Sequence, residues 1–145
     1  MLMIRILFLL LVTLNVHSMN VIPLTLSQSD TSLKLHLSSP IGVPAKSKAT
    51  AGKVSRKTLD TTLLNMPLFV IGADRVSIQW LEQHQEELKS MQATGFITNV
   101  NDFETIVALQ EKFKLPLLPV NVDPLLAYLH EQHYPLIIAE GAVWQ

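Results

Sequence analysis

Residues 133–145 read HYPLIIAEGAVWQ, and this stretch decides the fold because a proline stands directly before an apolar run. Leu136–Ala139 is predicted to be a buried strand, followed by a turn and a last strand at Ala142–Trp144. Proline has no amide hydrogen to donate to a β-ladder, so Pro135 belongs at the head of the strand or at a bulge. It is also the residue that most readily accepts a cis peptide bond. The stretch therefore predicts a terminal hairpin whose entry is shaped by Pro135.

Three strand–helix units are predicted before this hairpin. The strands are Leu68–Gly72, Phe96–Val100 and Leu115–Val120. The helices run from Arg75 to about Met91, from an Asn101-x-x-Glu104 capping box to about Phe113, and from Pro124 to about Gln132. Asp74 and Asp123 are expected to cap the first and third helices. The order β-α-β-α-β-α-β-β predicts an α/β domain over residues 67–145 with a mainly parallel core and antiparallel terminal strands.

Apolar side chains mark the buried faces of the first two helices. Side chains that recur every three or four residues lie on one face of a helix, and that face is expected to point into the core. In the first helix the expected stripe is Leu81, Leu88 and Met91, with Trp80 alongside and preferred as a core residue. In the second helix the residues expected to point inward are Phe103, Ile106, Val107 and Phe113.

The first 18 residues, MLMIRILFLLLVTLNVHS, have the pattern of a secretory signal peptide. Arg5 gives a positive start, Ile6–Leu14 is a short apolar core, and Val16 and Ser18 are small residues before the expected cleavage site. The apolar run is short for a membrane span. An uncleaved N-terminal anchor remains the alternative, and membrane association is expected only in that case. Cleavage would make the protein periplasmic.

Residues 19–66 form a basic arm, with six basic and two acidic residues, whereas residues 67–145 have four basic and ten acidic residues. Short strands are expected at Val21–Leu26 and Leu33–Leu37, and Ser38–Arg56 is expected to be a flexible linker because it contains glycine, proline and many small polar residues. The arm is either a solvated linker or a segment that docks on an acidic partner or on its own domain. Direct nucleic-acid binding is not expected, because the domain is acidic.

Motifs for catalysis and for cofactors are weak. The chain has no cysteine, which excludes disulfides, thiolate metal sites and dithiol redox chemistry. His130 and His133 are three residues apart, whereas the zincin helix needs a separation of four, so no metal is expected. Glu82 and Glu86 lie one turn apart but are expected to be a solvated face, with Glu87 beside them. Ser77 lacks a nearby base and a nucleophile elbow. No cofactor and no catalytic residue are predicted.

The stretch from a helix end through Tyr134-Pro135 to the final hairpin resembles the C-terminal half of the thioredoxin fold. That resemblance implies a cis proline that faces the strand-to-helix turn where redox cysteines normally lie. Here this turn reads Gly72-Ala73-Asp74-Arg75-Val76-Ser77, without cysteine. The expectation is therefore a redox-inactive thioredoxin-like domain. The additional unit at Phe96–Phe113 makes the chain more similar to TrbC of F-type conjugation systems.

A closer resemblance covers about 67–145 and is to an uncharacterised family of integrating conjugative element proteins, which are encoded among type IV secretion genes. The stretches that carry it are PLFVIGAD, the Trp80-Leu81 pair, GFITNV, LPLLPV and HYPLII. The resemblance implies an exported accessory protein of conjugative DNA transfer. Its expected partners are other exported type IV secretion or pilus assembly proteins.

The surface expected to bind a partner combines Asp74, Arg75, Ser77, Tyr134 and Pro135. The backbone before a cis proline is able to pair with an extended peptide, and a helix N-terminus offers free amides. A purely structural turn at Pro135 remains open as the alternative. Two further readings of function also remain open. One is a periplasmic isomerase or hydrolase that uses His130, His133 or the glutamates, and the other is a component tethered to the inner membrane.

Overall fold

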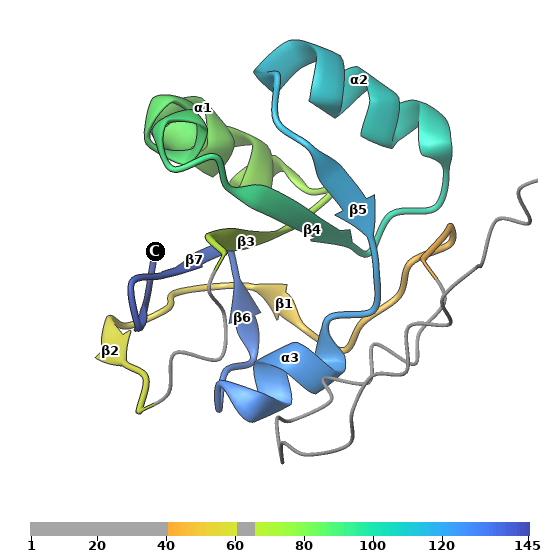
Figure 1. Cartoon of the computed structure of the whole chain (residues 1–145). Helices are drawn as coiled ribbons and strands as arrows, with labels where there is room; N and C mark the ends of the chain where they lie inside the picture. The colour runs from red at the N-terminus through yellow and green to blue at the C-terminus, as the bar shows by residue number, and fades with distance from the viewer. Residues whose placement is uncertain (1–40, 61–65) are drawn as a thin grey trace, which may run out of the picture. The chain divides into compact units, whose positions relative to one another are not determined.

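A computed structural model describes residues 41–60 and 66–145. The predicted signal peptide and the predicted strands Val21–Leu26 and Leu33–Leu37 lie outside the described residues. The structure is a mixed α/β fold with three helices and a central six-stranded sheet (Figure 1). Among the described helices, none has both the length and the hydropathy required to cross a bilayer.

The six-stranded sheet has the order β2-β8-β7-β3-β4-β5. Its central strand β3 (Leu68–Gly72) is parallel to β4 (Thr94–Thr98), which is parallel to β5 (Leu117–Pro119). On the other side, β7 (Leu136–Ala139) is antiparallel to β3 and to β8 (Ala142–Trp144). The predicted strands and hairpin of this core are confirmed, and β5 lies at an edge, where its proline is tolerated.

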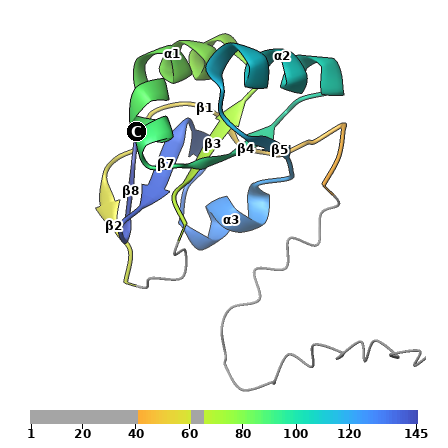
Figure 2. The same cartoon turned by 45° about the horizontal axis from the view of Figure 1, so that its top comes forward.

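Two helices cover one face of the sheet and the third covers the other (Figure 2). α1 (Arg75–Ser90) and α2 (Phe103–Phe113) pack on the first face, and the short α3 (Asp123–Tyr128) packs on the opposite face. The β3 side chains alternate between the two cores, since Phe69 belongs to the first core and Val70 to the second. α3 ends four residues before the predicted Gln132.

The inward face of α2 differs from the prediction. Ile106, Leu109 and Phe113 are buried, whereas Phe103 is 58% and Val107 47% exposed. Phe103 and Val107 are four residues apart. Because each residue turns the helix by about 100°, both lie on the same outer face of α2. The predicted capping box is also wrong, because Asp102 caps the helix and accepts a hydrogen bond from the Thr105 amide at 2.8 Å.

Part of the basic arm is folded, so the predicted flexible linker is wrong for residues 41–56. The arm supplies β1 (Thr50–Ala51), which is parallel to β6 (His133–Tyr134), and β2 (Lys57–Thr58), which is antiparallel to β8. Its buried side chains are Ala45, Ala49 and Val54. These apolar residues are too widely spaced to form a strand or helix pattern, but each is small enough to lie against the domain while the basic neighbours point to solvent. Of the alternatives for the arm, docking on its own domain describes residues 41–60.

Candidate functional site

The turn after β3 is held by the cap of α1. Asp74 accepts a hydrogen bond from the Ser77 amide at 2.9 Å and from the Ser77 hydroxyl at 3.2 Å. The same hydroxyl accepts a hydrogen bond from the Gly72 amide at 2.9 Å. Ser77 is completely buried, and both hydrogen bonds of its hydroxyl stay within the turn. The Ser77 side chain therefore supports the loop, in line with the absence of a nucleophile elbow in the sequence.

Tyr134 reaches this turn from β6. Its ring is buried, and its phenol accepts a hydrogen bond from Asn99 Nδ2 at 3.3 Å. Burial raises the pKa of Tyr134; the Asn99 hydrogen bond opposes this, and the negative charge of Asp74 adds to it. A side chain on Gly72 would lie 2.6 Å from Tyr134 Oη and closer still to Asp74. The missing side chain at Gly72 is thus what lets the tyrosine and the aspartate meet.

The structure brings together four of the five predicted partner-binding residues. Asp74 and Ser77 are hydrogen-bonded to each other, the Tyr134 phenol lies beside them at Gly72, and Pro135 follows Tyr134 through a cis peptide bond, as the resemblance implies. Arg75 does not join them. It is the first residue of α1, its side chain is exposed, and within the described ranges it makes no hydrogen bond or ion pair. Arg75 is therefore available at the surface beside these residues.

A groove of about 470 Å³ runs beside Pro135. Its walls come from α1, from the arm and from the last strand's end; they are formed by Gly52, Lys53, Val76, Gln79, Trp80, Gln83, His84, Pro135 and Gln145. Trp80 is buried, as expected of a core residue, and its indole stacks on the His84 ring at 4.5 Å between centroids. Trp80 Nε1 is buried without a hydrogen-bond partner among the described residues. The groove is therefore lined by the side-chain amides of three glutamines and by the stacked rings of Trp80 and His84.

The arm occupies the backbone edge that was predicted to pair with a partner. The Gly52 amide donates to the Tyr134 carbonyl at 2.9 Å, and the Thr50 amide donates to the Gln132 carbonyl at 3.2 Å. The Thr50 side chain also contacts the His133 ring, with 3.1 Å between Oγ1 and Nδ1. In this structure the residue before Pro135 is paired with the chain's own residues 50–52.

Two carboxamides hold the arm in place. Asn99 accepts a hydrogen bond from the Ser47 amide at 3.0 Å and donates to the Ala49 carbonyl at 3.0 Å, in addition to its contact with Tyr134. Gln145 donates to the carbonyls of Gly52 and Pro135 and accepts from the Val54 amide. Sequence reasoning missed both residues. The available signal was weak: Asn99 directly follows a strand, and it has the positive φ of 53° that asparagine tolerates.

Asp123 serves the arm and does not cap α3 as predicted. Its carboxylate accepts hydrogen bonds from the Ser47 hydroxyl and the Lys48 amide, both at 2.8 Å. The helix N-cap is Val122, which makes no side-chain hydrogen bond. Lys57 fastens the other end of the arm, because its ammonium contacts Glu131 and the Leu129 carbonyl, each at 2.6 Å. The arm thus spans both ends of α3, and Lys57 is the basic side chain of the described arm that pairs with an acidic residue.

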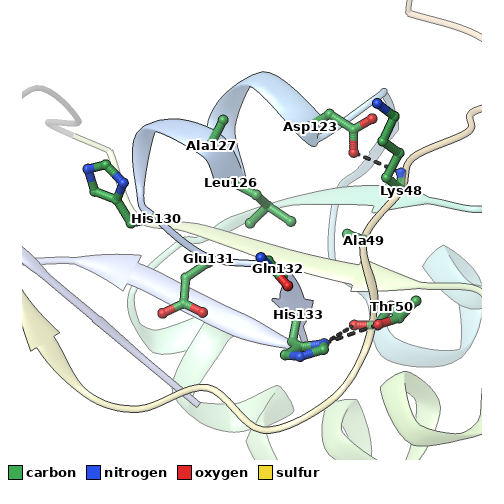
Figure 3. Close-up of a pocket in the computed structure, with 10 residues that line it drawn as sticks. All are labelled: Lys48, Ala49, Thr50, Asp123, Leu126, Ala127, His130, Glu131, Gln132 and His133. Carbon is green, nitrogen blue, oxygen red and sulfur yellow. Dashed lines mark hydrogen bonds between the residues drawn. The ribbon is translucent and has the colours of Figure 1, made fainter.

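A second pocket, of about 690 Å³, lies between the arm and α3 (Figure 3). His130, Glu131 and His133 line it, but the His133 ring is directed to Thr50 while His130 points elsewhere (Figure 3). Among the described residues, no group of three or more histidine and acidic side chains is arranged to hold a metal ion. The Glu82 carboxylate forms an ion pair with Lys112, and the Glu86 carboxylate forms an ion pair with Lys89. Both ion pairs lie on helix surfaces.

The sheet and the docked arm define the class as a mixed α/β protein with a helix pair on one face of a six-stranded sheet. The family model described as "Protein of unknown function (DUF2859)" matches residues 20–143, and the chain belongs to this family. No curated protein and no solved structure matches the chain significantly. The matched range includes the described part of the arm.

Proposed function

We propose that this protein is a non-enzymatic accessory or assembly protein of a conjugative type IV secretion system of an integrating conjugative element. It works in the periplasm, after export through residues 1–18, and it acts by binding another exported secretion or pilus protein. One observation carries the binding role. Pro135 and the first turns of α1 line a single open groove, in a chain that has no cysteine for redox chemistry.

The strand arrangement supports a redox-inactive thioredoxin-like domain. β3 and β4 are parallel neighbours connected by α1, and β7 and β8 extend antiparallel from β3. The turn after β3 lies against Tyr134 of β6, the residue directly before Pro135, and the resemblance implies a cis proline opposite this turn. Where thioredoxins place cysteines, this chain has Asp74 and Ser77. The Ser77 hydroxyl is buried and hydrogen-bonded within the turn, so it fixes the shape of the turn.

The walls of the groove support a peptide or protein ligand. Gln79 and Gln83 are one turn apart on α1, and Gln145 lines the same groove. Carboxamides both donate and accept, so they suit the backbone of an extended segment. Binding pockets of this kind combine a few polar groups with aromatic surface.

The test is the mating frequency of the parent element after a clean in-frame deletion, with the gene restored in trans. We expect a loss of transfer that the wild-type gene restores. The groove is tested by Gln83→Arg, which places a long cation on its wall, with Gln85→Arg on the same helix outside the groove as the matched control. Transfer should fall with Gln83→Arg alone. Unchanged transfer after deletion would refute the role in the apparatus.

A further inference from the structure

The stretch of arm that covers β6 is exposed between two buried anchors. Ala45 is 4% and Val54 5% exposed, and they fix the arm on either side. Between them the side chains of Lys48, Thr50, Ala51 and Lys53 are exposed, and Ala49 alone is buried. Segments with few buried apolar contacts open locally at lower free energy than the core. The covering of β6 is thus the part of the arm that opens most readily.

Most of the polar contacts that hold this stretch are made to its backbone. Asn99 contacts the Ser47 amide and the Ala49 carbonyl, and Gln145 contacts the Gly52 carbonyl and the Val54 amide. The β6 backbone adds the hydrogen bonds to Thr50 and Gly52. Main-chain hydrogen bonds give affinity for an extended segment irrespective of its sequence. The same atoms would therefore hold another strand in the same position.

Two positions do select side chains. Ala49 is 6% exposed and packs in the core on the α3 face. At Gly52 an added Cβ would lie 2.6 Å from the His133 ring, a distance that real Cβ atoms essentially never show. The edge therefore accepts a small residue, two residues with exposed side chains, and then glycine. This pattern describes the chemistry of a matching ligand.

We propose that Gln132–Tyr134, together with Asn99 and Gln145, is a strand-binding site, and that an extended small-x-x-Gly segment of a partner protein takes the place of Ala49–Gly52. This inference rests on the proposed function, since it names the edge through which the partner is held. The arm is then an internal competitor: it covers the edge until the partner's segment arrives. Its exposed stretch leaves while Ala45 and Val54 stay anchored.

Binding is tested with the full chain and a fluorescent seven-residue peptide of the arm's own sequence, SKATAGK, residues 47–53, which leaves out the anchors Ala45 and Val54. Gly52→Leu displaces the arm in cis, so this variant should bind the peptide at least tenfold more tightly than wild type. Ala51→Leu is the matched control, because Ala51 is exposed, and it should bind like wild type. A peptide with leucine at the position of Gly52 should lose binding to all three proteins. Equal binding of the natural peptide by all three, or no binding by Gly52→Leu with its arm released in hydrogen exchange, would overturn the inference.

A disulfide tests the same site without relying on a bulky substitution. Thr50 and His133 are register partners with contacting side chains, and the chain has no other thiol. Oxidised Thr50→Cys/His133→Cys should bind the peptide at least tenfold more weakly than its reduced form, and mating should fall at least tenfold relative to either single cysteine variant. Thiol labelling reports the oxidation state in cells.

The two proposals fail in different ways. If deletion abolishes mating but the oxidised double variant supports full transfer, the strand-exchange inference is wrong and the assembly role stands. If deletion has no effect, the assembly role is wrong. The peptide measurement then still decides whether the edge binds a strand.

Discussion

The amide of Gly52 donates a hydrogen bond to the carbonyl of Tyr134 across 2.9 Å, although the two residues belong to opposite parts of the chain. This contact joins the arm to the residue that precedes Pro135. On its other side, the Tyr134 phenol lies against the turn that leads to α1, where a Cβ on Gly72 would meet both this phenol and the Asp74 carboxylate. A single tyrosine therefore connects the arm to the turn after β3. Four predictions follow from this connection and from the residues around it.

Gly72→Ala should destabilise the fold by about 1–3 kcal/mol, because the new methyl group would press on Asp74 and Tyr134. The measurement is the free energy of unfolding in urea. Gly42→Ala is the control, since a Cβ at Gly42 meets no atom within 4 Å. Equal stability of the two variants would contradict the close approach of the tyrosine and the aspartate.

Tyr134 should make stability fall at alkaline pH. Its pKa is raised in the folded protein above the ordinary value of 10.0, so the phenol stays neutral in the fold while it ionises in the unfolded chain. The stabilisation that the neutral Tyr134 phenol contributes is fully present below pH 10. It is lost as the pH rises through the pKa of Tyr134 in the folded protein. Tyr134→Phe should remove this part of the pH dependence. The check is urea unfolding of both proteins from pH 8 to 11, and parallel pH curves would contradict the assignment.

Asn99→Ala should destabilise the protein by about 1–3 kcal/mol, because the Ser47 amide and the Ala49 carbonyl lose their partner. Hydrogen exchange should show faster exchange along residues 47–52 than in wild type. Gln92→Ala is the matched control for backbone strain, since Gln92 also has a positive φ, 54°, but is exposed. A similar loss in both variants would mean that backbone conformation, and not the carboxamide, explains the effect.

Alanine at His130, or at Glu82 and Glu86 together, should leave conjugative transfer within about threefold of wild type, because the proposed function assigns none of these side chains a chemical step. Mating frequency is the measurement, with immunoblotting to establish equal protein levels. The enzymatic alternative makes the opposite prediction. Loss of transfer in one of these variants, with the protein present at normal level, would favour that alternative.

The core of the fold was predictable because its signals are local. Leu68–Gly72 and Leu136–Ala139 are continuous apolar runs, and Asp74 stands where a helix cap is expected. The predicted helix caps were wrong where two adjacent residues were able to cap the helix, or where one carboxylate had a second possible partner. Asp102 replaced Asn101 as the cap of α2, and the Asp123 carboxylate bonds to the arm instead of its own helix. A sequence pattern does not state which of two adjacent acceptors meets the helix.

The candidate site was predictable in part. Asp74, Ser77 and Tyr134 meet as expected, because the topology of a strand, a turn and a helix brings them together. The arm was missed because its partners are remote in sequence and its own composition is that of a linker. Asn99 and Ser47 are separated by 52 residues, and neither has a periodic signal. Polar contacts over such separations depend on the finished fold.

Gln145 and Gly52 are hydrogen-bonded across 93 residues, and β2 pairs with β8 at the far end of the chain. Contacts between distant residues require the closure of a long loop before they add any stability, and proteins rich in such contacts fold slowly. The contacts of β2 with β8 and of Gly52 and Val54 with Gln145 therefore need the last strand. In a chain that is made or translocated from its N-terminus, these contacts wait until the last residues emerge. During this interval the arm covers the edge at Tyr134 with fewer contacts, which favours a competing strand.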